Sequence, residues 1–184
     1  MRHVPTLTTE RLLLKPLQAD DAQQIQQRYP RWEIVRYMVD TVPWPYPDNG
    51  AEHYVNNVAL PDVEKGIAWF WTIRRRQAPE ELMGLICLYD VEDNNRGFWL
   101  TPEWQGKGYM REASVAVTDY WFNTLHKPVL RAPKAAANLR SQRISASSGM
   151  RLIRTGKKAY VSGILDSELW EITRDEWNAR DDAR

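Results

Sequence analysis

Apolar and polar stretches alternate along the chain in a way that predicts short strands and helices in mixed order. Apolar, aromatic or β-branched runs bounded by turn residues predict strands. These strands are expected at 11–17, 66–76, 82–91, 96–100, 128–136, 150–161 and 167–177. Because only the segment 77–81 (QAPEE) separates the second strand from the third, we expect these two to pair in antiparallel fashion.

Helical periodicity is found between these strands, at 19–29, 32–39, 51–60 and 138–149 and directly after the turn at 102–108. In the helix after this turn, apolar positions at steps of three and four form one face: Met110, Ala113, Val117, Tyr120 and Trp121. Three prolines exclude regular structure from 40–50. The order of the elements favours the α+β class and one domain, residues 1–184, with its core at about 8–177.

Composition and net charge exclude several classes of protein. The chain has 184 residues and a net charge of +1, which gives no overall attraction to nucleic acid or to a membrane surface. The one cysteine, Cys87, excludes an intramolecular disulfide and a cysteine zinc site, and its apolar surroundings predict a buried, inert thiol. No apolar run approaches the roughly 20 residues that span a bilayer, and the first residues have no signal-peptide pattern. We therefore expect a cytoplasmic protein.

The segment PEWQGKGYMREA (102–113) is the first candidate for chemistry. It has no Cys, His or paired carboxylates, but it joins a strand to a helix through two glycines. The first amides of a helix have no partner within it, and the helix dipole adds positive charge there, so a phosphate can bind. Gly108 is followed by Tyr109 and residue 111 is Arg, which excludes the Walker A and dinucleotide patterns. A connection that binds nothing remains the alternative at this point.

Four motifs then occur in order: TERLLLKPL, QGKGYM, NLRSQRISASSGM and LWEITRDEW. This order resembles the GNAT N-acetyltransferase superfamily and, within it, the ribosomal-protein Nα-acetyltransferase-like (RimJ/RimL-type) branch. The family's acetyl-CoA loop reads (Q/R)-x-x-G-x-(G/A), and Met110 departs from it at the last position. The spacing from Asn138 to Gly149 matches the family's helix after the cleft, with Ser141 in the serine place. The resemblance covers residues 8–177.

The resemblance implies a mixed, mostly antiparallel central sheet flanked by helices, with a splayed strand pair forming the acetyl-CoA cleft. The pantetheine arm of the co-substrate acetyl-CoA would pair with the backbone of Trp99 and Leu100, and Asn138 would reach it. Arg140 or Arg143 would meet the adenosine phosphates, unless they form a solvated helix face. The pyrophosphate would bind the loop amides: Gln105, Gly106, Lys107, Gly108, Tyr109 and Met110. An N–H near Leu100 would polarise the thioester carbonyl.

Direct transfer to an amine also requires two proton movements. Where the family often has Glu, this chain has Asn95, so Glu92 or Asp93 would act as base through water, unless they only form a solvated turn. Where the family often has a Tyr acid, this chain has Ser145, which leaves Ser141 as candidate acid or as CoA ligand. His3, His53 and His126 show no clustering, and no metal is expected.

The acceptor is an amine of open identity. The chain has 9 Trp and 8 Tyr against 3 Phe, which suits either core and crevice edges or an aromatic-walled site. The candidate substrate wall comprises Trp44, Tyr46, Trp69, Trp71 and Tyr89. We expect an α-amine of a protein N-terminus, a peptide or an amino-acid-like molecule. The alternatives are a catalytically inactive CoA-binding protein or an enzyme that detoxifies an antibiotic or aminoacyl-nucleotide. A monomer or homodimer is expected, without nucleic acid or membrane partners.

Overall fold

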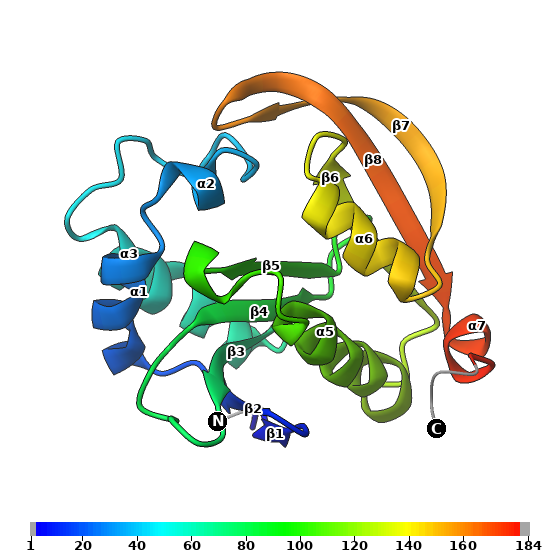
Figure 1. Ribbon diagram of the computed structural model, residues 1–184, viewed down its shortest axis with the longest axis horizontal. Coiled ribbons are helices and arrows are strands. Elements are labelled where there is room, and N and C mark those ends of the chain that lie inside the picture. Colours follow the sequence, from blue (N-terminus) through cyan, green and yellow to red (C-terminus); the bar gives the residue numbers. More distant parts are fainter. Residues whose placement is uncertain (1–2, 181–184) are drawn as a thin grey trace.

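The computed structural model describes residues 3–180, which form two antiparallel sheets of strands (Figure 1). The first sheet has the order β1-β2-β3-β4-β5, with β1 at Leu7–Thr8, β2 at Leu12–Pro16, β3 at Ala68–Arg75, β4 at Gly84–Tyr89 and β5 at Arg96–Leu100. The second has the order β6-β8-β7, with β6 at Val129–Ala135, β7 at Arg151–Tyr160 and β8 at Gly163–Thr173. The predicted α+β class is confirmed, as is the antiparallel β3–β4 pair.

The helices fill the intervals that periodicity predicted, with three differences, of which the first is that the helix predicted over 51–60 continues to Lys65. They are α1 (Ala22–Arg28), α2 (Trp32–Val35), α3 (Gly50–Tyr54), α4 (Leu60–Lys65), α5 (Tyr109–Asp119), α6 (Leu139–Ser147) and α7 (Arg174–Asn178). The helix predicted over 32–39 ends at Val35. The last predicted strand ends at Thr173, whose side chain accepts from the Glu176 N–H and caps α7. No helix within residues 3–180 is long and apolar enough to cross a membrane.

Helices cover the five-stranded sheet from two sides (Figure 1). One core cluster joins alternate strand residues, such as Trp71 and Ile86, to the apolar face of α5. The other joins the intervening residues, such as Phe70 and Cys87, to α1 and α3. Because successive strand residues point to opposite faces, every second residue of β3, β4 and β5 faces α1 and α3.

The two sheets meet at one point and then separate. The Asn95 N–H donates to the Arg131 carbonyl at 2.8 Å, and the Arg131 N–H donates to Asn95 Oδ1 at 2.8 Å. Beyond this junction β5 and β6 belong to different sheets. The backbone edges of two neighbouring strands therefore face a gap instead of each other.

The hairpin of β7 and β8 extends beyond β6 and arches over to the segment after α2 (Figure 1). At its tip the Val161 N–H donates to the Met38 carbonyl at 2.9 Å, and Ser162 Oγ donates to the Arg36 carbonyl at 2.7 Å. The hairpin thus links the helical side of the molecule to the second sheet and spans the space between them.

Candidate active site

The loop that precedes α5 presents bare backbone amides. Gly106 and Gly108 have φ angles of 77° and 81°, in the left-handed region that favours glycine. Gly108 is the N-cap of α5, and the first helical bond runs from the Glu112 N–H to its carbonyl. Within residues 3–180, no N–H from 106 to 110 donates a hydrogen bond. These amides and the helix dipole form a cradle for an anion.

The loop is held in place from its outer side by Arg11 and Glu112. Arg11 Nη1 donates to the Lys107 carbonyl at 2.9 Å, and Arg11 Nε donates to Glu112 Oε1 at 2.8 Å. The Arg11 guanidinium also lies 4.3 Å from the centre of the Tyr109 ring. The contacts engage carbonyls and side chains, so they order the loop and leave its amides available.

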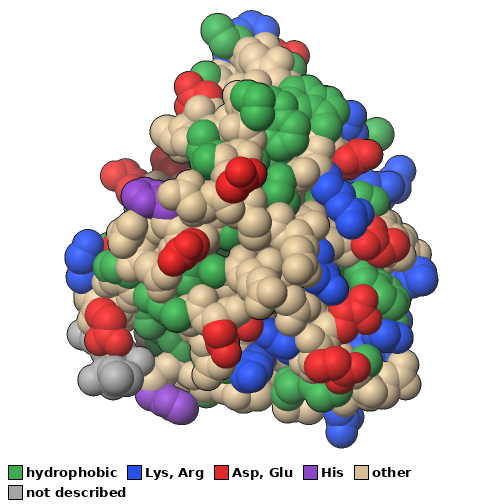
Figure 2. All heavy atoms as spheres, turned by 90° about the vertical axis from the view of Figure 1, so that its left-hand side faces the viewer, with side chains coloured by type: hydrophobic (Ala, Val, Ile, Leu, Met, Phe, Trp, Pro, Cys, Tyr) green, Lys and Arg blue, Asp and Glu red, His purple; other side chains and the backbone are tan. Residues whose placement is uncertain are grey.

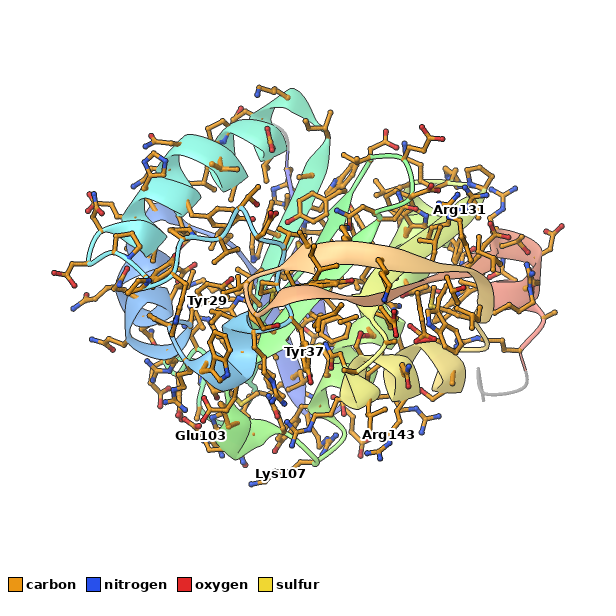
Figure 3. The ribbon with its side chains drawn as sticks, turned by 90° about the horizontal axis from the view of Figure 1, so that it is seen from above. Tyr29, Tyr37, Glu103, Lys107, Arg131 and Arg143 are labelled. Atoms are coloured by element: carbon orange, nitrogen blue, oxygen red, sulfur yellow. The ribbon has the colours of Figure 1, made fainter. Side chains whose placement is uncertain are left out.

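Gln105 joins the loop to the strands, which corrects one expectation. Its N–H donates to the Pro102 carbonyl at 3.2 Å, so the free amides begin at Gly106 and not at Gln105. Its side chain donates to the Leu100 carbonyl at 2.8 Å and accepts from Arg140 Nη1 on α6. Lys107 in this loop and Arg143 on α6 project from the same edge of the molecule (Figure 3).

The backbone of β5 alternates between β4 and the gap. Tyr89 and Thr101 donate to the carbonyls of Asn95 and Met83, which fixes the hydrogen-bonded parity of the β4–β5 pair. By this alternation the backbone of Trp99 faces β4, whereas the N–H groups of Phe98 and Leu100 face the gap. The backbone of Trp99, expected to pair with pantetheine, is therefore engaged with β4, whereas the backbone groups of Phe98 and Leu100 face the gap.

A cavity of about 810 Å³ lies between this gap and the helices of the other side. Six tyrosines line it: Tyr29, Tyr37, Tyr46, Tyr54, Tyr89 and Tyr160. The ring centre of Tyr29 is 5.2 Å from that of Trp99, and the hydroxyls of Tyr54 and Tyr89 are 3.3 Å apart. The described lining residues include no Asp or Glu.

Burial keeps the acidic groups Tyr29, Tyr54 and Cys87 of this cavity protonated, so they do not act as bases near neutral pH. It raises the pKa values of Tyr29 and Tyr54 above their usual range, so their phenols stay protonated. Burial also raises the pKa of the Cys87 thiol to about 12. The prediction that Cys87 is buried is confirmed, although Cys87 also lines the cavity.

Three of the five residues expected at the substrate wall lie elsewhere. Trp71 is fully buried, donates to the Pro5 carbonyl at 2.7 Å and packs on Tyr120, while Trp69 packs on Trp121. Both share one face of β3, but that face is turned toward α5. Trp44 is 41% exposed and stacks on Trp32. On the side of the molecule that carries α1 and α3, apolar side chains gather in the upper part of the surface (Figure 2). Tyr46 and Tyr89 do line the cavity.

Asn95, which stands where the family often has a catalytic Glu, and Asp93 beside it both form hydrogen bonds that stabilise the fold. Asn95 is buried, and its Nδ2 donates to the carbonyls of Tyr89 and Val91, so its side chain locks the strand junction. Asp93 accepts from Arg131 and Arg154, each at 2.6 Å, which lowers its pKa. Glu92 is exposed and does not line the cavity. The geometry thus gives no support to Glu92 as a base.

The start of α6 supplies the polar groups on the other side of the gap. Asn138 caps this helix by accepting from the Ser141 N–H at 3.4 Å, and both residues line the cavity. Sequence reasoning missed Lys134 on β6, whose Nζ donates to Ser141 Oγ at 2.9 Å. Lys134 is only 6% exposed. Its signal in the sequence was a cation on the same strand face as Leu130 and Ala132.

Residues 11–151 match the Acetyltransferase (GNAT) domain family. The chain belongs to this family. A curated relative, the Uncharacterized N-acetyltransferase YnaD of Bacillus subtilis (strain 168), is 27% identical over 180 residues, which cover 94% of this chain and 99% of the relative. The predicted identity as a GNAT N-acetyltransferase is confirmed.

Solved structures share the fold at low sequence identity. The ribosomal-protein-S5-alanine acetyltransferase from Vibrio fischeri superposes with a TM-score of 0.79 at 17% identity, covering 94% of this chain and 98% of that one. Mycobacterium smegmatis RimJ, in complex with CoA-disulfide, gives a TM-score of 0.79 at 17% identity, covering 90% and 83%. These acetyltransferases therefore share the fold of this chain.

Proposed function

We propose that this acetyltransferase moves the acetyl group of acetyl-CoA directly to the α-amine of a molecule with a neutral, apolar or aromatic body. A protein N-terminus, a peptide or an amino-acid-like compound fits this description. The pyrophosphate binds the amides of 106–110, and the pantetheine arm enters the gap between β5 and β6. There it pairs with the backbone of Phe98 and Leu100, and Asn138 contacts it from α6.

We infer the class of acceptor from the absence of carboxylates among the described lining residues of the cavity. A polycationic amine needs acidic side chains to replace the water it loses on binding. The described lining residues offer none, and they include the cationic Arg96, Lys134 and Lys158 instead. Aromatic rings and paired hydroxyls, by contrast, suit an apolar body with a few hydrogen-bonding groups. The geometry therefore favours one neutral amine over a chain of charged ones.

In the chemical step, the neutral amine attacks the thioester carbonyl while both substrates are bound. An N–H of Phe98 or Leu100 that the pantetheine arm leaves unpaired points into the gap and can stabilise the oxyanion that forms. One such donor typically contributes about 3 kcal/mol to transition-state stabilisation. The amine loses its proton to water, because the described lining residues include no carboxylate base.

A screen of amines with acetyl-CoA, read as release of free thiol, tests this proposal. The panel contains aromatic and aliphatic amino-acid amides, short peptides with free N-termini, an aminoacyl-nucleotide analogue, α-blocked lysine and spermidine. We expect the highest kcat/KM for the apolar α-amines and the lowest for spermidine. A preference for spermidine or for the blocked lysine would overturn the proposed acceptor class.

A further inference from the structure

Lys134 is a buried cation at the centre of the site that the mechanism above does not use. Its Nζ donates to Ser141 Oγ at 2.9 Å and to the Ser141 carbonyl at 3.2 Å, and it also contacts Ser145 Oγ. No salt bridge to Lys134 occurs within residues 3–180. A buried lysine without an acidic partner is costly, so its presence calls for a reason.

The register of the strands places Lys134 beside the reacting atoms. From the junction of Asn95 with Arg131, three residues along each strand lead to Phe98 on β5 and Lys134 on β6. Phe98 is one of the two residues whose N–H faces the gap. Lys134 and Ser141 both line the cavity that continues from this gap. The thioester sulfur, bound along this part of β5, would lie between the two strands and near Ser141.

We propose that Lys134 supplies the proton that neutralises the departing CoA thiolate, through the hydroxyl of Ser141. This assignment rests on the proposed acetyl-CoA site. The bond between the acyl carbon and sulfur breaks, and the thiolate takes the proton of Ser141 Oγ. Ser141 takes a proton from the Lys134 ammonium, which becomes a neutral amine. The proton that the acceptor nitrogen released to water restores the ammonium after the products leave.

The surroundings of Lys134 suit it to losing a proton. Burial lowers its pKa well below the ordinary value, and the charge of Arg96 on β5 lowers it further. Glu168 on the paired strand β8 acts in the opposite direction. From α6, the groups that face Lys134 are the neutral hydroxyls of Ser141 and Ser145. An ammonium held in this way is a stronger acid than an exposed lysine.

A purely structural role is the competing explanation, in which Lys134 only braces α6 against β6. The two roles differ in what they do to the sulfur of bound CoA. A cation next to a thiol favours the thiolate and lowers its pKa by roughly one to three units. A brace that is remote from the sulfur leaves that pKa unchanged. This readout needs neither an acceptor nor turnover.

The test is a pH titration of the thiol of bound CoA, followed by thiolate absorbance with the spectrum of the CoA-free protein subtracted. Lys134→Met is compared with the parent and with Lys157→Met, which removes an exposed lysine paired with Asp166. We expect the thiol pKa to rise by at least about one unit in Lys134→Met only. An unchanged pKa in a folded, CoA-binding Lys134→Met protein would refute the assignment.

A second variant and a binding measurement keep the outcomes separate. Lys134→Gln keeps a hydrogen-bonding side chain without the charge, and it replaces Lys134→Met if that variant does not fold. Calorimetric titration with CoA checks the site itself. Failure of the parent to bind CoA would overturn the proposed acetyl-CoA site. Binding with the same thiol pKa in the parent and in Lys134→Gln would overturn only the role of Lys134.

Discussion

The two ends of the proposed active site are built in opposite ways. The phosphate cradle comes from one continuous stretch, 106–110, and offers only backbone N–H groups. The acceptor cavity takes its walls from α1, from the segment after α2, from α3, from the inner face of the sheet and from the hairpin, and it offers mostly side chains. A backbone site can serve the same cofactor in many sequences, whereas a side-chain site changes with every substitution.

The two ends also differ in what holds them in shape. Arg11 and Glu112 order the cradle by contacts close to the loop. The cavity depends on distant contacts, such as the backbone bonds of the hairpin tip to Arg36 and Met38. We therefore expect substitutions in the loop to change the Kd for acetyl-CoA and substitutions in the cavity to change the KM for the amine, with little overlap between the two sets.

The largest effect is expected at the cradle. Gly108→Glu places a carboxylate where we propose that the pyrophosphate binds, and a φ of 81° strains any side chain there. The Kd for acetyl-CoA should rise by about 100-fold or more, which corresponds to roughly 2.7 kcal/mol. Calorimetry measures this. Gly108→Ala has the strain without the charge and should lose much less affinity. If Gly108→Glu binds CoA as tightly as the parent, the cradle has been assigned to the wrong segment.

Ser141→Ala changes the site between the phosphate-binding loop and the cavity, where the thioester is proposed to lie. It removes the hydroxyl that links Lys134 to the leaving sulfur, so kcat should fall by roughly 100-fold or less, the low end for a lost proton donor. The Kd for acetyl-CoA should change little. Steady-state kinetics at saturating acceptor tests this. An unchanged kcat with a raised KM for acetyl-CoA would show that Ser141 is a binding residue only.

The pH dependence should follow the acceptor, because the described lining of the cavity has no carboxylate base. Only the neutral amine reacts, so log(kcat/KM) should rise with unit slope, tenfold per pH unit, and level off at the acceptor's own pKa. That pKa is about 7.7–8.0 for α-amines and about 10.4 for lysine. Two acceptors of different amine pKa give the comparison. One shared plateau would point to an enzymic base, and His53 on the cavity lining would then be the first residue to replace.

The smallest expected effect distinguishes an aromatic residue that lines the cavity from one on the outer surface. Trp99→Leu removes a ring that packs on Tyr29 in the cavity, so the KM for an aromatic acceptor should rise about tenfold, or roughly 1.4 kcal/mol. The Kd for CoA should stay the same. Trp44→Leu makes the same change on the outer surface and should leave both constants unaltered. Equal effects of the two variants would mean that the acceptor binds the outer face.

The strands show why side-chain sites are harder to predict than backbone sites. The pattern at Trp69 and Trp71 correctly predicted that the two side chains share a face. It did not say which face, because both faces of this sheet are covered by helices. The same limit applies to Trp99, whose ring faces the cavity while its backbone pairs with β4. Lys134 was missed because a single cation in a short strand does not reveal what lies across from it.

The sequence by itself determined the element order, the family and the glycine turn that exposes helix amides. Each of these depends on local backbone preferences or on spacing along the chain. Only the tertiary structure decided which aromatic residues line the cavity, how Asn95 locks the strand junction and where Lys134 lies. Those features join residues far apart in the sequence, and their positions follow from strand register and the direction of each sheet face. Periodicity alone leaves that direction open.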